Sequence, residues 1–145
     1  ITARGTHDIL IIGRTDALPV HGIDEAAARA RTYQDVGADL IFVDGVKTRN
    51  EVISIAEKVS GPKIISLVDG TDAANLDAKE LEEMGFKIVI YAVAALFAQA
   101  RAGVDVLASI KENGKLLPNS SNMTYDAFCK IVNLDVHQDF ARPFE

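Results

Sequence analysis

The segment ADLIFVD at Ala38–Asp44 decides the fold of this chain. It is short, continuous and apolar, and it does not alternate apolar with polar residues. Three other runs share this pattern: Ile9–Gly13 (ILIIG), Lys63–Val68 (KIISLV) and Lys87–Tyr91 (KIVIY). Strands that are buried on both faces have this composition, which is typical of parallel sheets. The sequence therefore predicts four strands of a parallel sheet.

Helical patterns with recognisable caps lie between and after these runs. Thr48 with Glu51, and Asp77 with Glu80, have the spacing of a capping box. Glycines end several of the patterns, as they commonly do one residue beyond a helix. The expected helices are 25–36 after Asp24, 52–59, 81–84, 92–113 and 124 to about 136, with Gly37, Gly85 and Gly114 ending the first, third and fourth.

The strands recur about every 25 residues, so the order is that of four successive β/α units. One interpretation is a small doubly wound sheet. The other is half of a parallel (β/α)8 TIM-type barrel, which normally needs about 250 residues. A half-barrel has two open sheet edges and half a core, so it should not be stable alone. In either fold the loops after the strands, here 13–22 and 69–75, are where a site is expected.

The composition excludes several kinds of partner. The chain has 145 residues, a net charge of −6 and 48% hydrophobic residues, without clusters of Lys or Arg that would favour nucleic acid. The longest apolar stretch, residues 88–97, is too short to cross a membrane. Cys129 is the only cysteine, so a disulfide framework is impossible and a cytoplasmic location is expected.

Polar residues at the strand ends are the candidate site. Arg14 and Asp16 follow the first run, and an arginine there favours a carboxylate or phosphate ligand, although a structural Arg14–Asp16 pair is the alternative. Asp44 could orient a substrate hydroxyl, bind a metal-bound water, pair with Arg14, or serve as a turn residue. Ser66 and Asp69 could contact a ligand, but Asp-Gly is also an ordinary turn signal.

Three segments together carry a family resemblance: IIGRTDAL (11–18), GIDEAAARARTYQDVGADLIFVDG (22–45) and ELEEMGFKIVIYAVAALFA (80–98). Taken in order, they resemble the isocitrate lyase and phosphoenolpyruvate mutase superfamily, in particular the 2-methylisocitrate lyases and carboxyphosphonoenolpyruvate mutase-like proteins. The resemblance extends from about Asp8 to Phe128. It implies a magnesium-dependent β/α barrel of roughly twice this length, in which this chain supplies strands five to eight.

The same resemblance implies what lies elsewhere in such a protein. The aspartates that bind the metal are expected on the first four strands, and a lid with a Lys-Lys-Cys-Gly-His motif is expected there too. No position of this chain matches them, so no metal ligand is assigned here and the Mg²⁺ ligands are expected in an amino-terminal half. The chain is accordingly expected to be part of a longer polypeptide or to pair with its other half.

The resemblance assigns roles to a few residues. Arg14 matches the arginine that binds the substrate carboxylate, and Asp44 stands where 2-methylisocitrate lyases have a substrate-contacting glutamate. We therefore expect Arg14 and Asp44 to be catalytic and Thr15, Asp16 and Ser66 to join them in binding substrate. Ser66 replaces a usual asparagine, and Phe97 and Tyr125 replace arginines of the tricarboxylate lyases. Because each lost arginine removes a carboxylate partner, the substrate should carry fewer carboxylates than methylisocitrate.

The expected activity is cleavage of a carbon–carbon bond in a small 2-hydroxy or 2-oxo (di)carboxylate through an enolate. The alternatives are a phosphonopyruvate-type phosphonomutase or hydrolase, a 2-oxo acid decarboxylase, and a non-catalytic half-barrel remnant or assembly subunit.

The expected organisation is a half-barrel over residues 1–123 and a terminal helix and tail over 124–145. The polar linker 116–122 separates the terminal helix from the barrel, and Tyr125, Phe128 and Val132 form an apolar face on that helix. Members of the superfamily exchange their last barrel helix between subunits. We therefore expect a homo-oligomer, a dimer or tetramer, in which the terminal helix packs on a neighbouring subunit.

Overall fold

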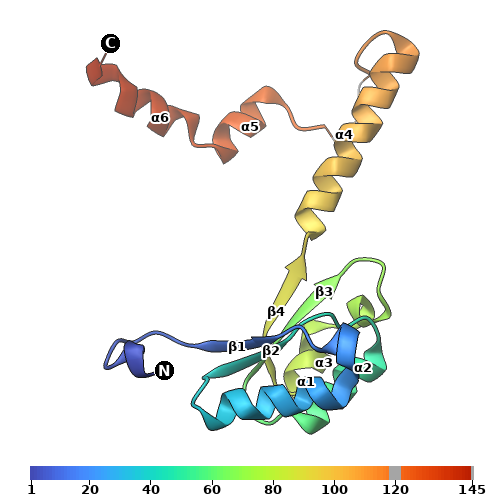
Figure 1. Cartoon of the computed structure of the whole chain (residues 1–145). Helices are drawn as coiled ribbons and strands as arrows, with labels where there is room; N and C mark the ends of the chain where they lie inside the picture. The colour runs from blue at the N-terminus through green and yellow to red at the C-terminus, as the bar shows by residue number, and fades with distance from the viewer. Residues whose placement is uncertain (118–121, 145) are drawn as a thin grey trace. The chain divides into compact units, whose positions relative to one another are not determined.

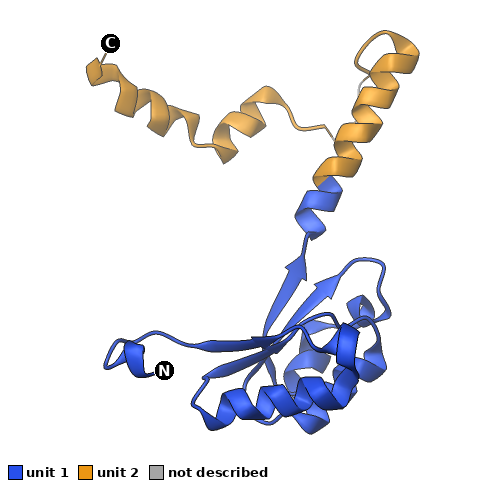
Figure 2. Cartoon of the chain, in the orientation of Figure 1, with its two compact units in different colours: residues 1–98 blue, residues 99–145 orange. Residues whose placement is uncertain are grey.

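The structure is a computed structural model that describes residues 1–117 and 122–144. The chain forms two compact units, residues 1–98 and residues 99–145 (Figure 2). The division falls within helix α4 (Ala94–Asn113). Most of the linker predicted at 116–122, and the last residue of the predicted tail, lie outside the described residues. The boundary expected between 123 and 124 stays a prediction, because it separates the half-barrel from a helix that is expected to pack on a neighbouring subunit.

Unit 1 contains a four-stranded parallel sheet, as the sequence predicts (Figure 1). Its strands are β1 (Ile12–Thr15), β2 (Leu40–Val43), β3 (Lys63–Val68) and β4 (Phe86–Ala92), hydrogen-bonded in chain order. All three pairings are parallel. Consecutive β/α units in this order leave β1 and β4 as the two outer strands, which is the arrangement of half a β/α barrel.

Three helices pack on one face of this sheet, which we call the helix-covered face. They are α1 (Leu18–Asp35), α2 (Arg49–Lys58) and α3 (Ala78–Glu83), and they lie on the same side in Figure 1. Gly13 shows how close this packing is, because a Cβ added there would lie 2.8 Å from Tyr33 Cβ of α1. The core of this face includes Ala26, Ala27, Ala30, Ile41, Val43, Val52, Ile55, Ile65, Leu67 and Leu81.

Two helix starts have the capping boxes that the sequence predicts. The Thr48 side chain accepts from Glu51 N at the start of α2, and Glu51 accepts from Thr48 N. Asp77 and Glu80 make the same reciprocal pair at the start of α3. Each pair satisfies amide groups that the first turn of a helix leaves without partners, so the two predictions are confirmed.

Three predicted segments differ from the structure, and two of them lie near the first strand. The strand begins at Ile12 and ends at Thr15, whereas the prediction was Ile9–Gly13. Ile11 N donates instead to the Asp39 carboxylate at 2.7 Å, and Arg4 also bonds that carboxylate. The loop expected at 13–22 is partly helical, because α1 starts at Leu18 and continues through a kink at Gly22, whose φ is 81°. The loop expected at 69–75 likewise contains a short 3-10 helix, Asp72–Asn75.

The opposite side of the sheet, which we call the inner face, is built by the alternate residues of each strand. One row crosses all four strands, since Arg14 pairs with Phe42, Phe42 with Ile64, and Ile64 with Ile88. Leu40, Phe42 and Ile64 form a small buried cluster at its centre. The margins are exposed, with Ile12 at 48%, Ile88 at 42% and Ile90 at 41%. The full set is Ile12, Arg14, Leu40, Phe42, Ile64, Ser66, Ile88 and Ile90.

A buried lysine lies at the amino end of β3. Lys63 is 4% exposed and donates to the carbonyl oxygens of Val59, at 3.0 Å, and Gly61, at 3.1 Å. Its ammonium group also lies 5.8 Å from the centre of the Phe86 ring. Burial lowers the pKa of Lys63. The side chain thus provides a polar partner for backbone carbonyls just beyond the end of α2.

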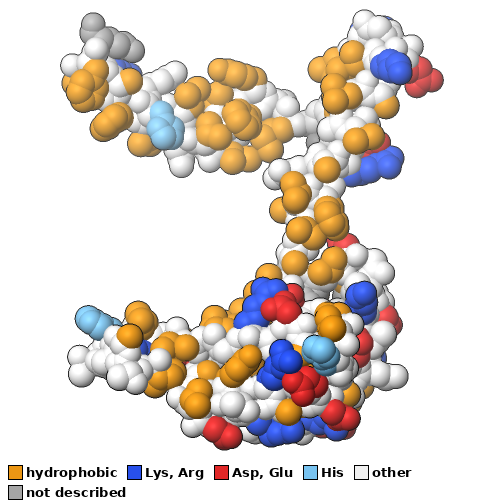
Figure 3. Space-filling view, in the orientation of Figure 1, with side chains coloured by type: hydrophobic (Ala, Val, Ile, Leu, Met, Phe, Trp, Pro, Cys, Tyr) orange, Lys and Arg blue, Asp and Glu red, His pale blue; other side chains and the backbone are white. Residues whose placement is uncertain are grey.

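Unit 2 contains the remainder of α4, then α5 (Tyr125–Ile131), α6 (Leu134–Ala141) and a short 3-10 helix, Arg142–Phe144. The single helix predicted from 124 to about 136 is wrong, because Asn133 adopts a left-handed conformation (φ 48°) that separates α5 from α6. None of the described residues of α4, α5 and α6 is buried, and Figure 3 shows apolar side chains exposed along these helices. Within the described residues, no helix is long and apolar enough to span a membrane.

Candidate functional site

Arg14, Asp16 and Asp44 meet at the carboxyl ends of β1 and β2. Arg14 Nη2 donates to Asp16 Oδ1 and to Asp44 Oδ2, each at 2.7 Å. Arg14 Nε also lies 3.3 Å from Asp16 Oδ1 and 3.2 Å from Asp16 Oδ2. The strand register explains the meeting, since Arg14 pairs with Phe42 and Asp44 lies two residues beyond it. We call these three residues the Arg14 cluster.

The charges in the cluster support one another. The hydrogen bond to Asp16, and then the charge of Asp44, raise the pKa of Arg14 above its usual range. The same hydrogen bond lowers the pKa of Asp16. Both groups are therefore ionised near neutral pH. One guanidinium and two carboxylates carry a net single negative charge, so an anionic ligand bound here would need a further cation.

Phe42 lies beneath the guanidinium. Arg14 Cζ is 5.0 Å from the centre of the Phe42 ring, within the range of a cation–π contact. Phe42 itself is only 8% exposed, so its ring is held by its neighbours. Sequence reasoning missed this partner. The available signal was the alternation of the second strand, which puts Phe42 on the same face as Asp44.

Ser66 lies on the inner face, two residues beyond Ile64 in β3 and opposite Ile90 in β4. Because Ile64 pairs with Phe42, Ser66 is level with Asp44 on the neighbouring strand. The register therefore brings the predicted Ser66 to the same end of the same face as the Arg14 cluster. It makes no side-chain hydrogen bond within the described residues.

Thr15 has a different place. It is 3% exposed, and its Oγ1 accepts from Ala17 N at 3.2 Å. Strand alternation directs it to the helix-covered face, away from Arg14. The structure thus does not bring Thr15 together with the cluster, and its hydroxyl has a turn-stabilising contact instead. The substrate-binding role expected for Thr15 stays a prediction, for a residue that the structure places apart from the Arg14 cluster.

Asp69 and Phe97 are the other predicted positions in unit 1. The segment after Asp69 forms a turn, which was one of the two interpretations of Asp69-Gly70. Gly70 has a φ of 84°, and Thr71 Oγ1 donates to Val68 O at 2.8 Å. Phe97 is 48% exposed on α4. Tyr125 belongs to unit 2, where it is 76% exposed.

The residues present do not form a metal site. Across 1–117 and 122–144, no group of three or more His, Cys, Asp or Glu is placed to hold an ion. Asp16 and Asp44 are the only carboxylates of the Arg14 cluster, and both already accept from its guanidinium.

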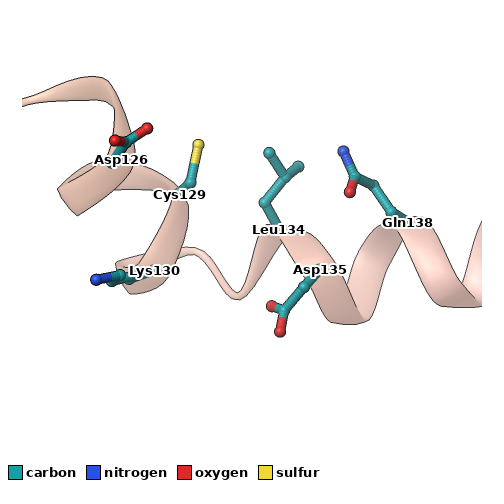
Figure 4. Close-up of a pocket in the computed structure, with 6 residues that line it drawn as sticks. All are labelled: Asp126, Cys129, Lys130, Leu134, Asp135 and Gln138. Atoms are coloured by element: carbon teal, nitrogen blue, oxygen red, sulfur yellow. The ribbon is translucent and has the colours of Figure 1, made fainter.

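A pocket of about 410 Å³ lies between α5 and α6 in unit 2. In Figure 4, Cys129, Leu134 and Gln138 point to one side of these helices, Asp135 points to the opposite side, and Lys130 points away from α6. The polar groups therefore do not converge on one ligand position, and the pocket has no arrangement that indicates chemistry. Its full lining is Asp126, Cys129, Lys130, Leu134, Asp135 and Gln138.

The fold agrees with the comparison to known families. The sequence model described as phosphoenolpyruvate phosphomutase matches residues 1–111. The chain belongs to the phosphoenolpyruvate phosphomutase family, within the phosphoenolpyruvate mutase/isocitrate lyase superfamily. The resemblance found in the sequence is thereby confirmed, as is the expected α/β fold of half a barrel.

Individual relatives support the same assignment. The chain is 33% identical to the chloroplastic carboxyvinyl-carboxyphosphonate phosphorylmutase of Arabidopsis thaliana, covering 92% of this chain and 40% of that protein. A crystal structure of 2,3-dimethylmalate lyase is 30% identical, with a TM-score of 0.78, covering 94% of this chain and 45% of that one. A phosphonopyruvate hydrolase in complex with oxalate and Mg²⁺ has the same fold, with 23% identity, a TM-score of 0.80 and coverage of 97% and 51%. The chain spans about half the length of the relatives it matches.

Proposed function

We propose that this chain is the carboxylate-binding half of a magnesium-dependent lyase. The lyase would cleave a carbon–carbon bond of a small 2-hydroxy or 2-oxo (di)carboxylate through an enolate. The observation that carries the proposal is the Arg14 cluster, which presents a charged guanidinium at the carboxyl end of a parallel sheet. That edge is where β/α barrels build their active sites.

Arg14 is the residue that would bind the substrate carboxylate. Its Nη1 nitrogen donates to no described residue, so it has hydrogens available for an anion, while Asp16 occupies the Nε and Nη2 side. Asp44 accepts one Nη2 hydrogen and would be close enough to the ligand to bond a substrate hydroxyl. Ser66, level with Asp44, would add a smaller polar contact.

Magnesium is part of the proposal although this chain would not bind it. The net negative charge of the Arg14 cluster supports the need for a second cation beside an anionic substrate. Its ligands would come from amino-terminal strands of the longer polypeptide, as the family resemblance implies. A cytoplasmic location is likewise part of the proposal.

Phosphonate chemistry is the second candidate. The chain is 33% identical to a carboxyvinyl-carboxyphosphonate phosphorylmutase, which favours this candidate. It is 30% identical to 2,3-dimethylmalate lyase, which favours the lyase to a similar degree. A mutase or hydrolase acting on phosphonopyruvate would use the same arginine, since guanidinium binds carboxylate and phosphonate groups alike. A 2-oxo acid decarboxylase would need the same cluster.

The test uses the full polypeptide that contains this chain, with Mg²⁺ and a panel of 2,3-dimethylmalate, 2-methylisocitrate, oxaloacetate and phosphonopyruvate. We expect magnesium-dependent release of a 2-oxo acid from one of the hydroxy acids. Turnover of phosphonopyruvate or oxaloacetate instead would replace the lyase with the corresponding alternative. The absence of turnover with any of them, in a folded protein, would favour a non-catalytic remnant.

We also propose that α5 and α6 pack on a neighbouring subunit of a homodimer or homotetramer. The supporting observation is that these helices expose Tyr125, Phe128, Ile131, Val136 and Phe140, a set of apolar side chains that water does not favour. Removing residues 124–145 from the full polypeptide should lower the particle mass measured by light scattering. An unchanged mass would exclude these helices from the assembly.

A further inference from the structure

Arg14 is held by two carboxylates, Asp16 and Asp44, and by the aromatic ring of Phe42. Asp16 accepts from the Nε and Nη2 side of the guanidinium. The ring of Phe42 lies beneath the guanidinium group. Arg14 Cζ is 5.0 Å from the centre of this ring. These two kinds of contact fix both the rotation of the guanidinium and its height above the sheet.

We propose that Phe42 is a positioning residue, whose ring holds the Arg14 guanidinium so that its Nη1 nitrogen points toward the bound carboxylate. The inference rests on the proposed function, in which Arg14 binds the substrate carboxylate. Phe42 acts through Arg14 and does not itself touch the ligand.

Three observations support this role. Phe42 is the direct pairing partner of Arg14 across β1 and β2, so the backbone fixes the distance between them. Phe42 is 8% exposed and packs with Leu40 and Ile64, which leaves its ring little freedom to move. The Arg14 side chain is 50% exposed, so without a partner below it the long side chain would sample many rotamers.

The Phe42 ring has a further electrostatic consequence. The face of an aromatic ring is negative and attracts a cation without using a hydrogen bond. Asp16 and Asp44 already use Arg14 Nε and Nη2, so a third carboxylate below the arginine would compete with the ligand for Nη1. An aromatic ring holds the guanidinium while leaving the Nη1 hydrogens available for the ligand.

The first experiment measures the binding of oxalate, with saturating Mg²⁺, to the full polypeptide by isothermal titration calorimetry. Phe42→Leu removes the ring but keeps an apolar side chain, and Phe42→Tyr keeps the ring. Ile88→Leu is the matched control, because Ile88 lies in the same row of the inner face but outside the cluster that packs on Phe42. We expect Phe42→Leu to weaken oxalate binding about three- to tenfold, with Phe42→Tyr and Ile88→Leu within about twofold of the wild type.

Equal affinities of Phe42→Leu and the wild type would overturn the inference. So would an equal loss in Phe42→Tyr or in Ile88→Leu, because the ring beneath Arg14 would then not be the cause. If Phe42→Leu lowers the melting temperature, Phe42→Met replaces it, since its flexible side chain fills the space better.

The second experiment needs no ligand. In protein labelled with ¹⁵N-arginine, the Arg14 Nε–H signal is assigned by its loss in Arg14→Lys. We expect Phe42→Leu to move this signal, because the ring current is lost, and to speed its exchange with water several-fold. Phe42→Tyr should preserve both properties. An unchanged exchange rate in Phe42→Leu would overturn the positioning role.

The two experiments separate the two proposals. If the wild-type protein does not bind oxalate, the proposed function fails, and the Arg14 signal still decides whether Phe42 holds the guanidinium. If oxalate binds and the Phe42 variants behave as the wild type, the proposed function stands and the inference about Phe42 fails.

Discussion

The helix-covered face and the inner face of the sheet are built from the same four strands but have different contents. The covered face contains branched apolar residues, such as Ile41, Val43 and Ile65, that are almost completely buried. The inner face combines an apolar centre with Arg14, Ser66 and exposed isoleucines at its margins. The comparison indicates that one face stabilises the unit and the other is available for a ligand or for the rest of a barrel.

Each face also has its own cation. Lys63 is buried at the amino end of β3 and bonds backbone carbonyls, so its role is structural. Arg14 is half-exposed near the carboxyl end of β1 and bonds the carboxylates of Asp16 and Asp44. The buried cation thus lies at the amino end of the sheet, and the half-exposed cation lies at the end where β/α barrels build their active sites.

The largest expected effect is on folding. Ile65→Ala on the covered face should lower the free energy of unfolding of the full polypeptide by about 2–5 kcal/mol, because it leaves a cavity. Ile90→Ala is the matched variant on the inner face. We expect a comparable loss, because half a barrel should have its inner face enclosed by the other strands. Urea denaturation measures both, and a loss below about 1 kcal/mol for Ile90→Ala would indicate an inner face open to water.

The second prediction concerns the cation of the inner face. Arg14→Lys should weaken oxalate binding in the presence of Mg²⁺ by about tenfold or more, since lysine lacks the fork that bonds Asp16 and a ligand together. The melting temperature should change little, because Arg14 is half-exposed. Arg29→Lys, on the surface of α1, is the control. Wild-type affinity in Arg14→Lys would remove Arg14 from the binding site.

The third prediction concerns the cation of the covered face. Burial lowers the pKa of Lys63, so the unfolded chain binds more protons than the folded one between that lowered value and about 10.4, the ordinary lysine value. This group therefore adds stability as the pH rises through that interval. Lys63→Met lacks the effect, so the stability of the wild type relative to the variant should increase with pH.

Guanidinium denaturation at several pH values between 8 and about 10.5 would measure this difference. Lys79→Met, at an exposed position of α3, is the control and should show no such trend. Parallel pH profiles for the wild type and Lys63→Met would contradict the structural role of the buried lysine.

The smallest effect is expected outside both faces. Arg29 and Glu25 form an exposed pair one helical turn apart on α1, with Nε and Oε1 2.8 Å apart. Arg29→Ala should change the free energy of unfolding by less than about 0.5 kcal/mol, because exposed pairs are screened by water. Thermal unfolding in low and high salt measures it. A loss above about 1 kcal/mol would show that this exposed ion pair contributes to the stability of the fold, contrary to the prediction.

The covered face was largely predictable from the sequence because its signals are local. The capping boxes at Thr48 and Asp77 depend on residues three positions apart, and β3 matches its predicted bounds, Lys63–Val68. The start of β1 was not predictable in this way. Ile11 lies in a continuous apolar run, but its amide is bound by Asp39, which is distant in the sequence. The break at Asn133 also interrupts an unbroken apolar pattern.

The inner face was predictable only where residues follow strand ends. Arg14, Asp16 and Asp44 could be grouped because parallel strands bring such residues to one edge. Thr15 lies between two of these residues, yet alternation directs it to the other face, where it is buried. Phe42 could not be assigned to Arg14 without the register of β1 against β2. Which residues are neighbours on the inner face depends on how the strands are paired. That pairing results from packing between distant segments and cannot be inferred from local sequence.

The close contact between Gly13 and Tyr33 has a consequence for the thermodynamics of anion binding. Because α1 touches the strand backbone directly beside Arg14, that backbone is ordered before a ligand arrives. In the proposed function, binding of the substrate carboxylate would then not require the ordering of a loop, which costs about 1–2 kcal/mol for each residue ordered. The backbone that carries the arginine is already fixed by the packing of a glycine against a tyrosine.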